Sequence, residues 1–206
     1  MAKPKALVME PSKAWEDARS SHLSFVKQLE ILIPGYGYGD AHQASLTNEK
    51  LCTLLVAALR KSKNRAFDIV SFIFESHVEE VLDTRFQNLR DDIDIFSDEV
   101  KVRKLAWQPL PRHYLEMIIK RDVTLVHNTA KLNFMLNNVC TLLTGYRRID
   151  RKVFDVERIS RVLEKAKELV KVLVRAFKER EAIFNIQQED LEGAYERIRK
   201  EIAFKF

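Results

Sequence analysis

Hydrophobic side chains between Asp155 and Phe184 recur at alternating steps of three and four residues, with no Gly or Pro among them. This spacing predicts one long helix with a coiled-coil-like seam, which Arg180 alone interrupts. The seam consists of Val156, Ile159, Leu163, Ala166, Val170, Leu173, Phe177 and Phe184. A second row, at Val162, Leu169, Ala176 and Ile183, repeats every seven residues beside it. The widened apolar stripe indicates a bundle helix that contacts more than one neighbour.

Residues 112 to 144 carry a second heptad pattern, which ends at Thr144-Gly145. At about 1.5 Å per residue this helix would be roughly 50 Å long, so the bundle should be elongated. Its apolar row is Leu115, Ile118, Asp122, Leu125, Thr129, Leu132, Leu136, Val139 and Leu143. Asp122 and Thr129 place polar atoms on this seam. Such groups either fix register or partner choice, or simply lie at the edge of the buried face.

Shorter patterns predict the remaining helices. Ser12 is a candidate N-cap for a helix over 12–33 that Pro34 ends, and His22 lies on its apolar stripe as a core histidine. Thr47 is a candidate N-cap for a helix that ends at a polar turn over 61–64. A helix over 66–89 follows, whose aromatic rings should fill the bundle interior. We therefore expect an all-α fold: an elongated helical bundle of five or six helices, two of them about 30 residues long.

Two stretches break the helical pattern. Residues 34–40 read Pro-Gly-Tyr-Gly-Tyr-Gly-Asp, which predicts a surface loop or a loop that contacts a partner through Tyr36 and Tyr38. Residues 107–111 read Trp-Gln-Pro-Leu-Pro, a possible hinge within a single domain that spans 1–206.

Composition narrows the class of protein. The 206 residues are 46% hydrophobic and 32% charged, with only five Gly and five Pro, which favours a folded helical chain over a turn-rich one. Cys52 and Cys140 are too few for a disulfide framework and lie on apolar helical faces. Residues 1–9 contain only a short apolar run and no apolar run reaches roughly 18 residues, so we expect neither a secretory leader nor a membrane span. We therefore expect reduced thiols and an intracellular protein, cytoplasmic or nuclear, with no transmembrane segment.

Charge divides the chain into halves of opposite sign. Residues 1–100 hold 12 Lys and Arg against 16 Asp and Glu, and residues 101–206 hold 23 against 14. A basic half can bind RNA, DNA or acidic lipid, or the two halves can neutralise each other. The residues expected to bind an anion are Arg147, Arg148, Arg151, Lys152, Lys167, Lys171, Arg175 and Lys178.

Catalytic and metal-binding patterns are scarce. The sequence has no Cys-x-x-Cys and no Glu-x-x-His, so we expect no metal, no cofactor and no small-molecule substrate. The stretch Arg121-Asp-Val-Thr-Leu-Val-His127 is similar to the Arg-x(4 to 6)-His signature of the helical HEPN ribonucleases. The resemblance implies that Arg121 and His127 would act on the RNA 2′-hydroxyl and scissile phosphate. On one continuous helix, however, six positions separate the two side chains by about 240°.

These observations favour a non-enzymatic interaction or assembly protein with no catalytic residues, which binds another helical protein or itself. Binding of RNA, DNA or acidic lipid by the basic half is the alternative, and an HEPN-like ribonuclease is a more remote one. The apolar stripe near the C-terminus predicts an amphipathic helix that closes the bundle or docks on another chain. The expected interface residues are Asp122, Thr129, Leu191, Tyr195, Ile198, Ile202 and Phe206.

Overall fold

The computed structural model describes residues 11–76, 80–101, 109–146 and 156–185. Within these residues the chain forms six helices and no strand, so the predicted all-α class is confirmed. The helices are α1 (Pro11–Ser21), α2 (Leu23–Leu32), α3 (Ala41–Ser76), α4 (Glu80–Val100), α5 (Arg112–Tyr146) and α6 (Val156–Phe184). None of these helices is both long and apolar enough to cross a membrane.

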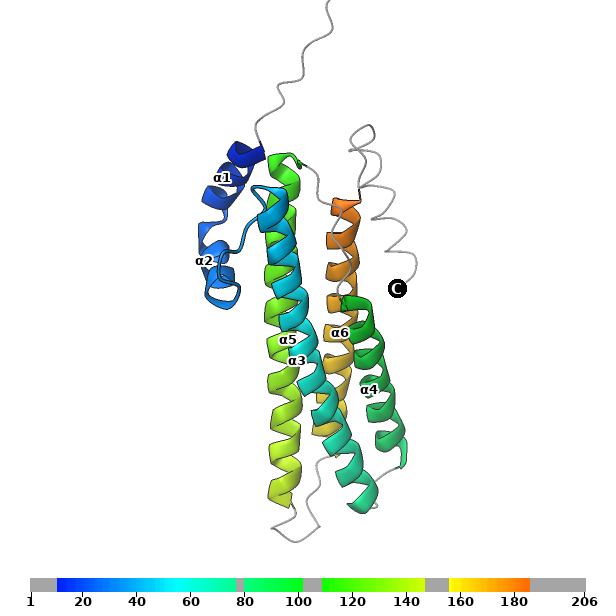
Figure 1. Cartoon of the computed structure of the whole chain (residues 1–206). Helices are drawn as coiled ribbons and strands as arrows, with labels where there is room; N and C mark the ends of the chain where they lie inside the picture. Colours follow the sequence, from blue (N-terminus) through cyan, green and yellow to red (C-terminus); the bar gives the residue numbers. More distant parts are fainter. Residues whose placement is uncertain (1–10, 77–79, 102–108, 147–155, 186–206) are drawn as a thin grey trace, which may run out of the picture.

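Four of the helices, α3 to α6, form an elongated bundle (Figure 1). Each contacts two neighbours: α3 packs on α4 and α5, and α6 packs on the same two helices. Since α3 and α5 run down the bundle in Figure 1 while α4 and α6 run up it, the α3/α5 and α4/α6 pairs are parallel. The two short helices α1 and α2 pack against the upper part of α5. They make the upper part of the molecule wider than the lower part.

The two heptad rows read from the sequence form the centre of the core. Every residue of the α5 row from Leu115 to Leu143 is buried, Asp122 and Thr129 included. The α6 seam is buried from Ile159 to Phe184. Arg180 occupies a seam position and is as buried as its apolar neighbours. The prediction of two long helices with inward-facing seams is therefore confirmed at the level of single residues.

Three predicted helix boundaries are wrong. The helix expected over 12–33 is divided at His22 into α1 and α2, at a position where the sequence has neither Gly nor Pro. The turn expected over 61–64 does not exist, because α3 runs unbroken from Ala41 to Ser76. The polar residues of that stretch are mostly the solvent face of a continuous helix, while Ser62 points inward and is buried. The helix expected to reach residue 89 is thus the second half of α3 followed by α4.

Two further expectations fail at the helix ends and faces. Thr47 does not cap a helix; Asp40 does, since its side-chain oxygen accepts a hydrogen bond of 2.8 Å from the Gln43 backbone N–H. Phe67 and Phe74 do not fill the interior, because both rings lie on the outer side of α3 and are exposed. Part of the hinge expected at 107–111 lies outside the described residues.

Candidate functional site

The Gly-Tyr loop is not a surface loop. The side chains of Tyr36 and Tyr38 are buried, which corrects the expectation from the sequence. Both phenols donate hydrogen bonds to the same carboxylate oxygen of Asp122 on α5, at 2.8 Å from Tyr36 and 2.6 Å from Tyr38. The backbone at Gly35 has φ of 79°, a left-handed conformation that glycine adopts without strain. The turn there directs both rings into the bundle.

Arg180 on α6 supplies the positive charge that this buried carboxylate needs. Its Nε donates to Asp122 Oδ1 at 2.6 Å, its Nη2 donates to the Tyr38 hydroxyl at 2.9 Å, and its Nη1 donates to Asn48 Oδ1 at 2.9 Å. The guanidinium also lies over the Phe184 ring, 5.2 Å from the ring centroid. The relative exposures of the Arg180 and Asp122 side chains are 1% and 0%. A buried charge pair of this kind is tolerated only when its other polar atoms are also satisfied, as they are here.

The protonation states of the buried cluster follow from these contacts. Burial raises the pKa of both Tyr36 and Tyr38 well above the ordinary tyrosine value, and the negative charge of Asp122 raises it further. Burial alone lowers the pKa of Arg180, but Asp122 and Tyr38 outweigh that effect and the net pKa is raised. The phenols therefore stay protonated and the guanidinium stays charged at neutral pH.

The cluster, which we call the polar lock (Tyr36, Tyr38, Asn48, Asp122 and Arg180), joins four parts of the chain. The loop after α2 meets α3, α5 and α6 at one level of the bundle. Aromatic rings frame the lock, with the Trp15 centroid 5.9 Å from that of Tyr38. The lock fixes the relative register of these helices. A shift of either α5 or α6 by one turn would separate Asp122 from Arg180 and leave a buried charge without its partner.

The structure places the residues that the sequence marked for partner binding as follows. Asp122 and Thr129 are buried inside the chain, where Asp122 belongs to the polar lock and Thr129 Oγ1 donates to the Leu125 carbonyl at 2.7 Å. A partner would reach neither residue without opening the bundle. The others lie outside the described residues: Leu191, Tyr195, Ile198, Ile202 and Phe206.

The basic residues expected to bind an anion are only partly described. Arg147, Arg148, Arg151 and Lys152 lie outside the described residues, whereas Lys167, Lys171, Arg175 and Lys178 lie on α6. Acidic side chains accompany two of the α6 residues. Glu168, and to a smaller extent Asp92 of α4, raise the pKa of Lys171, and Lys178 Nζ lies 3.9 Å from Glu99 Oε1.

These contacts belong to a regular series between α4 and α6. Arg85 forms an ion pair with Glu164 and Glu99 forms one with Lys178, and midway between them the charge of Asp92 attracts that of Lys171. Each pair is separated by 79 positions and follows the previous pair by seven, as two parallel helices in heptad register require. At two of these three positions an acid of α4 faces a lysine of α6, as expected if the two halves of the chain neutralise each other, and at the third the signs are reversed.

The pair that resembles the HEPN signature lies on α5. That helix is continuous from Arg112 to Tyr146, so Arg121 and His127 point in different directions. The Arg121 Nη2 atom lies 2.6 Å from Glu179 Oε2 of α6, whereas the His127 side chain is exposed. The arrangement does not bring the two side chains to a common point.

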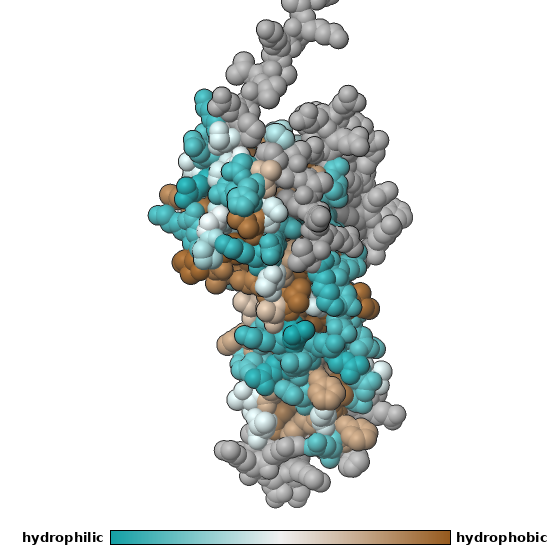
Figure 2. All heavy atoms as spheres, viewed as in Figure 1, coloured by the Kyte–Doolittle hydropathy of each residue, from teal (hydrophilic) through white to brown (hydrophobic). Residues whose placement is uncertain are grey.

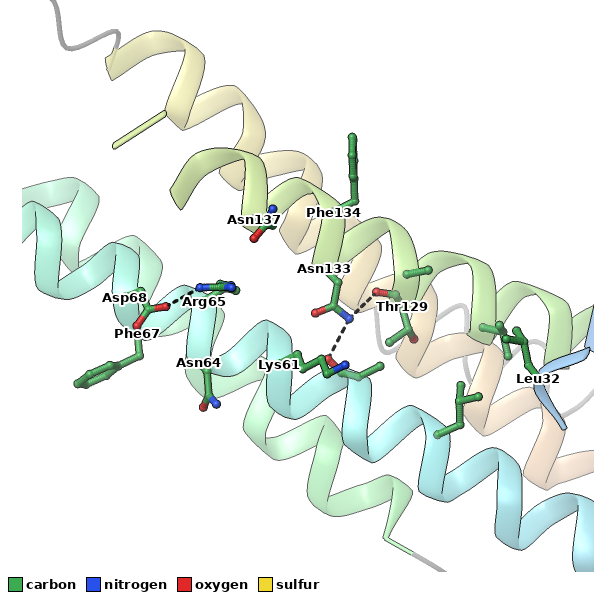
Figure 3. Close-up of a pocket in the computed structure, with 14 residues that line it drawn as sticks. Leu32, Lys61, Asn64, Arg65, Phe67, Asp68, Thr129, Asn133, Phe134 and Asn137 are labelled. Carbon is green, nitrogen blue, oxygen red and sulfur yellow. Dashed lines mark hydrogen bonds and ion pairs between the residues drawn. The ribbon is translucent and has the colours of Figure 1, made fainter. Parts of the chain in front are cut away.

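An open groove runs along the outer side of the α3/α5 pair and has a volume of about 1060 Å³ (Figure 3). Leu32, in the last turn of α2, lies at its upper end. Leu54 and Ala58 of α3 and Val126 and Ala130 of α5 give it an apolar floor. Phe67 of α3 and Phe134 of α5 lie at its outer edges: in Figure 3 the Phe67 ring points away from α5 and the Phe134 ring away from α3, and both residues are largely exposed. We call this feature the α3/α5 groove.

Two side chains of α5 bind backbone carbonyls of α3 in or beside the groove. The Asn133 amide donates to the Ala58 carbonyl at 3.0 Å, and the Cys140 thiol donates to the Arg65 carbonyl at 3.5 Å. Both pairs are separated by 75 positions and lie seven residues apart along each helix. The α3/α5 pair is therefore also in parallel heptad register, and the groove walls are fixed relative to each other.

Sequence reasoning missed both features for identifiable reasons. The polar lock could have been suspected, because Asp122 and Arg180 are opposite charges that each occupy a position of an apolar seam. The groove could not have been predicted, because it requires residues 41–76 to form one continuous helix that runs parallel to α5. Phe67 was also expected to fill the bundle interior, although it is exposed.

Comparison of the chain with models of protein families, with curated proteins and with solved structures finds no match. A function for this chain therefore has to be inferred from the arrangement of its described residues. Among the described residues, no group of three or more His, Cys, Asp or Glu is placed to hold a metal ion.

Proposed function

We propose that this protein is a non-enzymatic helical-bundle interaction protein that binds a helical segment of another protein in the α3/α5 groove. The observation that carries the proposal is the groove itself, an open channel with an apolar floor and an exposed phenyl ring at each outer edge. Contiguous exposed apolar surface is costly for a soluble domain unless a partner covers it. On the face seen in Figure 2, apolar residues gather where the wide upper part meets the narrow lower part.

The shape of the groove suits a helix. Between Val126 and Asn137 it extends along α5 for roughly 16 Å, about three helical turns. A helix that presents apolar residues at i, i+3 or i+4, and i+7 matches this length. The neighbouring α2 gives an intramolecular precedent, because it packs against α5 directly above the groove with Val26 and Leu29 buried.

The bundle can present this groove as a rigid surface. The polar lock fixes the upper end of α5 against α6 and the Gly-Tyr loop, and the Asn133 contact joins α5 to α3 beside the floor. Binding to a preformed surface avoids the entropic cost of ordering it. In this proposal the seams of α5 and α6 hold the bundle together, and the outer face of α3 and α5 binds the partner helix.

The test is a comparison of Phe134→Glu with the matched control Phe74→Glu. The two phenyl side chains belong to residues of 67% and 70% relative exposure, but only Phe134 lines the groove. Tagged protein is expressed in its native cells, and the co-purifying proteins and the ratio of absorbance at 260 and 280 nm are measured.

We expect a protein partner that is retained by the wild type and by Phe74→Glu and is lost with Phe134→Glu. Truncation of a central aromatic anchor commonly weakens an interface by about 2 kcal/mol or more, roughly 30-fold in affinity. An identical set of proteins with all three would contradict the proposal. Nucleic acid in place of a protein partner would favour the alternative, in which the basic half binds RNA or DNA.

A further inference from the structure

The charge of the groove walls narrows the kind of helix that fits. The charged side chains that line the groove all come from α3: Lys61, Arg65 and Asp68. The α5 residues that line it are uncharged. The lining therefore has two basic side chains and one acidic one, a net charge of +1.

Contacts within the chain cancel only part of this charge. Arg65 Nη1 lies 3.2 Å from Asp68 Oδ2 on the same wall, which leaves the charge of Lys61. The Lys61 side chain lies between α3 and α5 near Asn133 (Figure 3). The groove thus combines an apolar floor with a small excess of positive charge on its α3 side.

We propose that the occupant of the α3/α5 groove is an acidic amphipathic helix of a partner protein. Its apolar residues would pack on Leu54, Ala58, Val126 and Ala130, and its Glu or Asp residues would flank them and face Lys61 and Arg65. This inference rests on the proposed function, and it adds the chemistry of the partner. Complementary charge at the rim sets association rate and specificity, while the apolar floor and the phenyl rings provide most of the affinity.

A nucleic acid is the other class of ligand that basic side chains and exposed rings can bind. The floor of the groove favours a helix, because it consists of aliphatic side chains and is closed at one end by Leu32 of a packed helix. A nucleic-acid strand would leave that aliphatic floor without a matching apolar surface. We therefore treat binding of nucleic acid as an outcome of the test.

The test is a selection from a displayed library of amphipathic helices. The library keeps apolar residues at i, i+4, i+7 and i+11 and randomises the flanking positions among Glu, Lys, Gln and Ser. Peptides are selected on the full chain and counter-selected on Phe134→Glu, and the winners are synthesised. Their affinities are measured for the wild type, for the double variant Lys61→Glu/Arg65→Glu and for Phe74→Glu. Circular dichroism checks that each variant remains helical.

We expect groove-dependent peptides with Glu at the flanking positions. Their affinity should fall about 2- to 20-fold in the double charge variant and stay unchanged in Phe74→Glu, because exposed charge pairs contribute modestly. Groove-dependent peptides with neutral or Lys-rich flanks would overturn the acidic partner and leave the proposed function intact. A failure to obtain any groove-dependent peptide would overturn both. Binding of a fluorescent oligouridine that Phe134→Glu abolishes would replace the helix with single-stranded RNA.

Discussion

The pair formed by Asp122 and Arg180 provides the sharpest test of how the bundle is held together. The perturbation is a double-mutant cycle of Asp122→Asn, Arg180→Met and the combination of both. Each single substitution leaves one charge buried without its partner, since the two side chains are 0% and 1% exposed. Removing one member of such a pair costs about 3–5 kcal/mol. That is a large part of the roughly 5–15 kcal/mol by which a domain is stable.

The double variant should be much less damaged than the sum of the single variants. It contains no buried charge, and the side-chain carbonyl of the introduced asparagine can still accept from Tyr36 and Tyr38. We therefore expect a coupling energy of up to about 3 kcal/mol between the two positions. The free energy of unfolding is measured in urea by far-ultraviolet circular dichroism. Arg161→Met is the control, because Arg161 forms an ion pair with Glu157 in which both side chains are exposed.

A milder variant covers the case in which a single charge substitution prevents folding. Tyr36→Phe removes one of the hydrogen bonds that Asp122 accepts and leaves its contacts with Tyr38 and Arg180 in place. It should destabilise the protein by about 1.5–3 kcal/mol, the usual worth of a hydrogen bond to a charged group. Additive single variants in the cycle, or single losses no larger than that of Arg161→Met, would refute the polar lock.

Three other predictions follow from the same contacts. The pKa values of Tyr36 and Tyr38 are raised in the folded state, so the unfolded chain loses these protons first as the pH rises. Their ionisation therefore leaves the free energy of unfolding unchanged below about pH 10 and lowers it above that pH. In the double variant Tyr36→Phe/Tyr38→Phe, urea unfolding at alkaline pH should show a smaller loss of stability. Burial raises the pKa of both Cys52 and Cys140. A thiol reagent should modify the half-buried Cys140 before the buried Cys52, and equal rates of modification would contradict the difference in burial between the two thiols. Arg85→Met should change the free energy of unfolding by less than about 1 kcal/mol, because its pair with Glu164 is exposed to solvent; a larger loss in urea unfolding would mean that the α4/α6 charge series stabilises the fold.

Helices and their buried positions were predicted most accurately where the helical pattern was long and uninterrupted. The seams of α5 and α6 were correct from Leu115 to Leu143 and from Ile159 to Phe184, since each side chain at a seam position has few alternatives to burial. The prediction failed where a polar stretch was read as a turn, at 61–64, because Ser and Asn lower helix propensity without ending a helix. Only Gly and Pro are strong breakers, and that stretch contains neither.

The polar lock illustrates a different limit. Polar residues at seam positions were noticed at Asp122 and treated as an interruption at Arg180, but no pattern along the chain states that the two side chains meet. The pairing depends on the antiparallel register of α5 and α6, which arises from contacts between residues 58 positions apart. The burial of the two loop tyrosines depends on the same site, so a loop of Gly and Tyr could not be recognised as part of the core in advance.

The most direct test of the central claim, that the chain recognises a protein helix through the α3/α5 groove, is photo-crosslinking. A photoreactive phenylalanine analogue replaces Phe134 in the groove or Phe74 outside it, two positions of nearly equal exposure. After irradiation in the native cells, position 134 should give a discrete protein adduct that Ala130→Glu removes, and position 74 should not give that adduct. Equal adducts from both positions, or an adduct to nucleic acid at position 134, would contradict the claim.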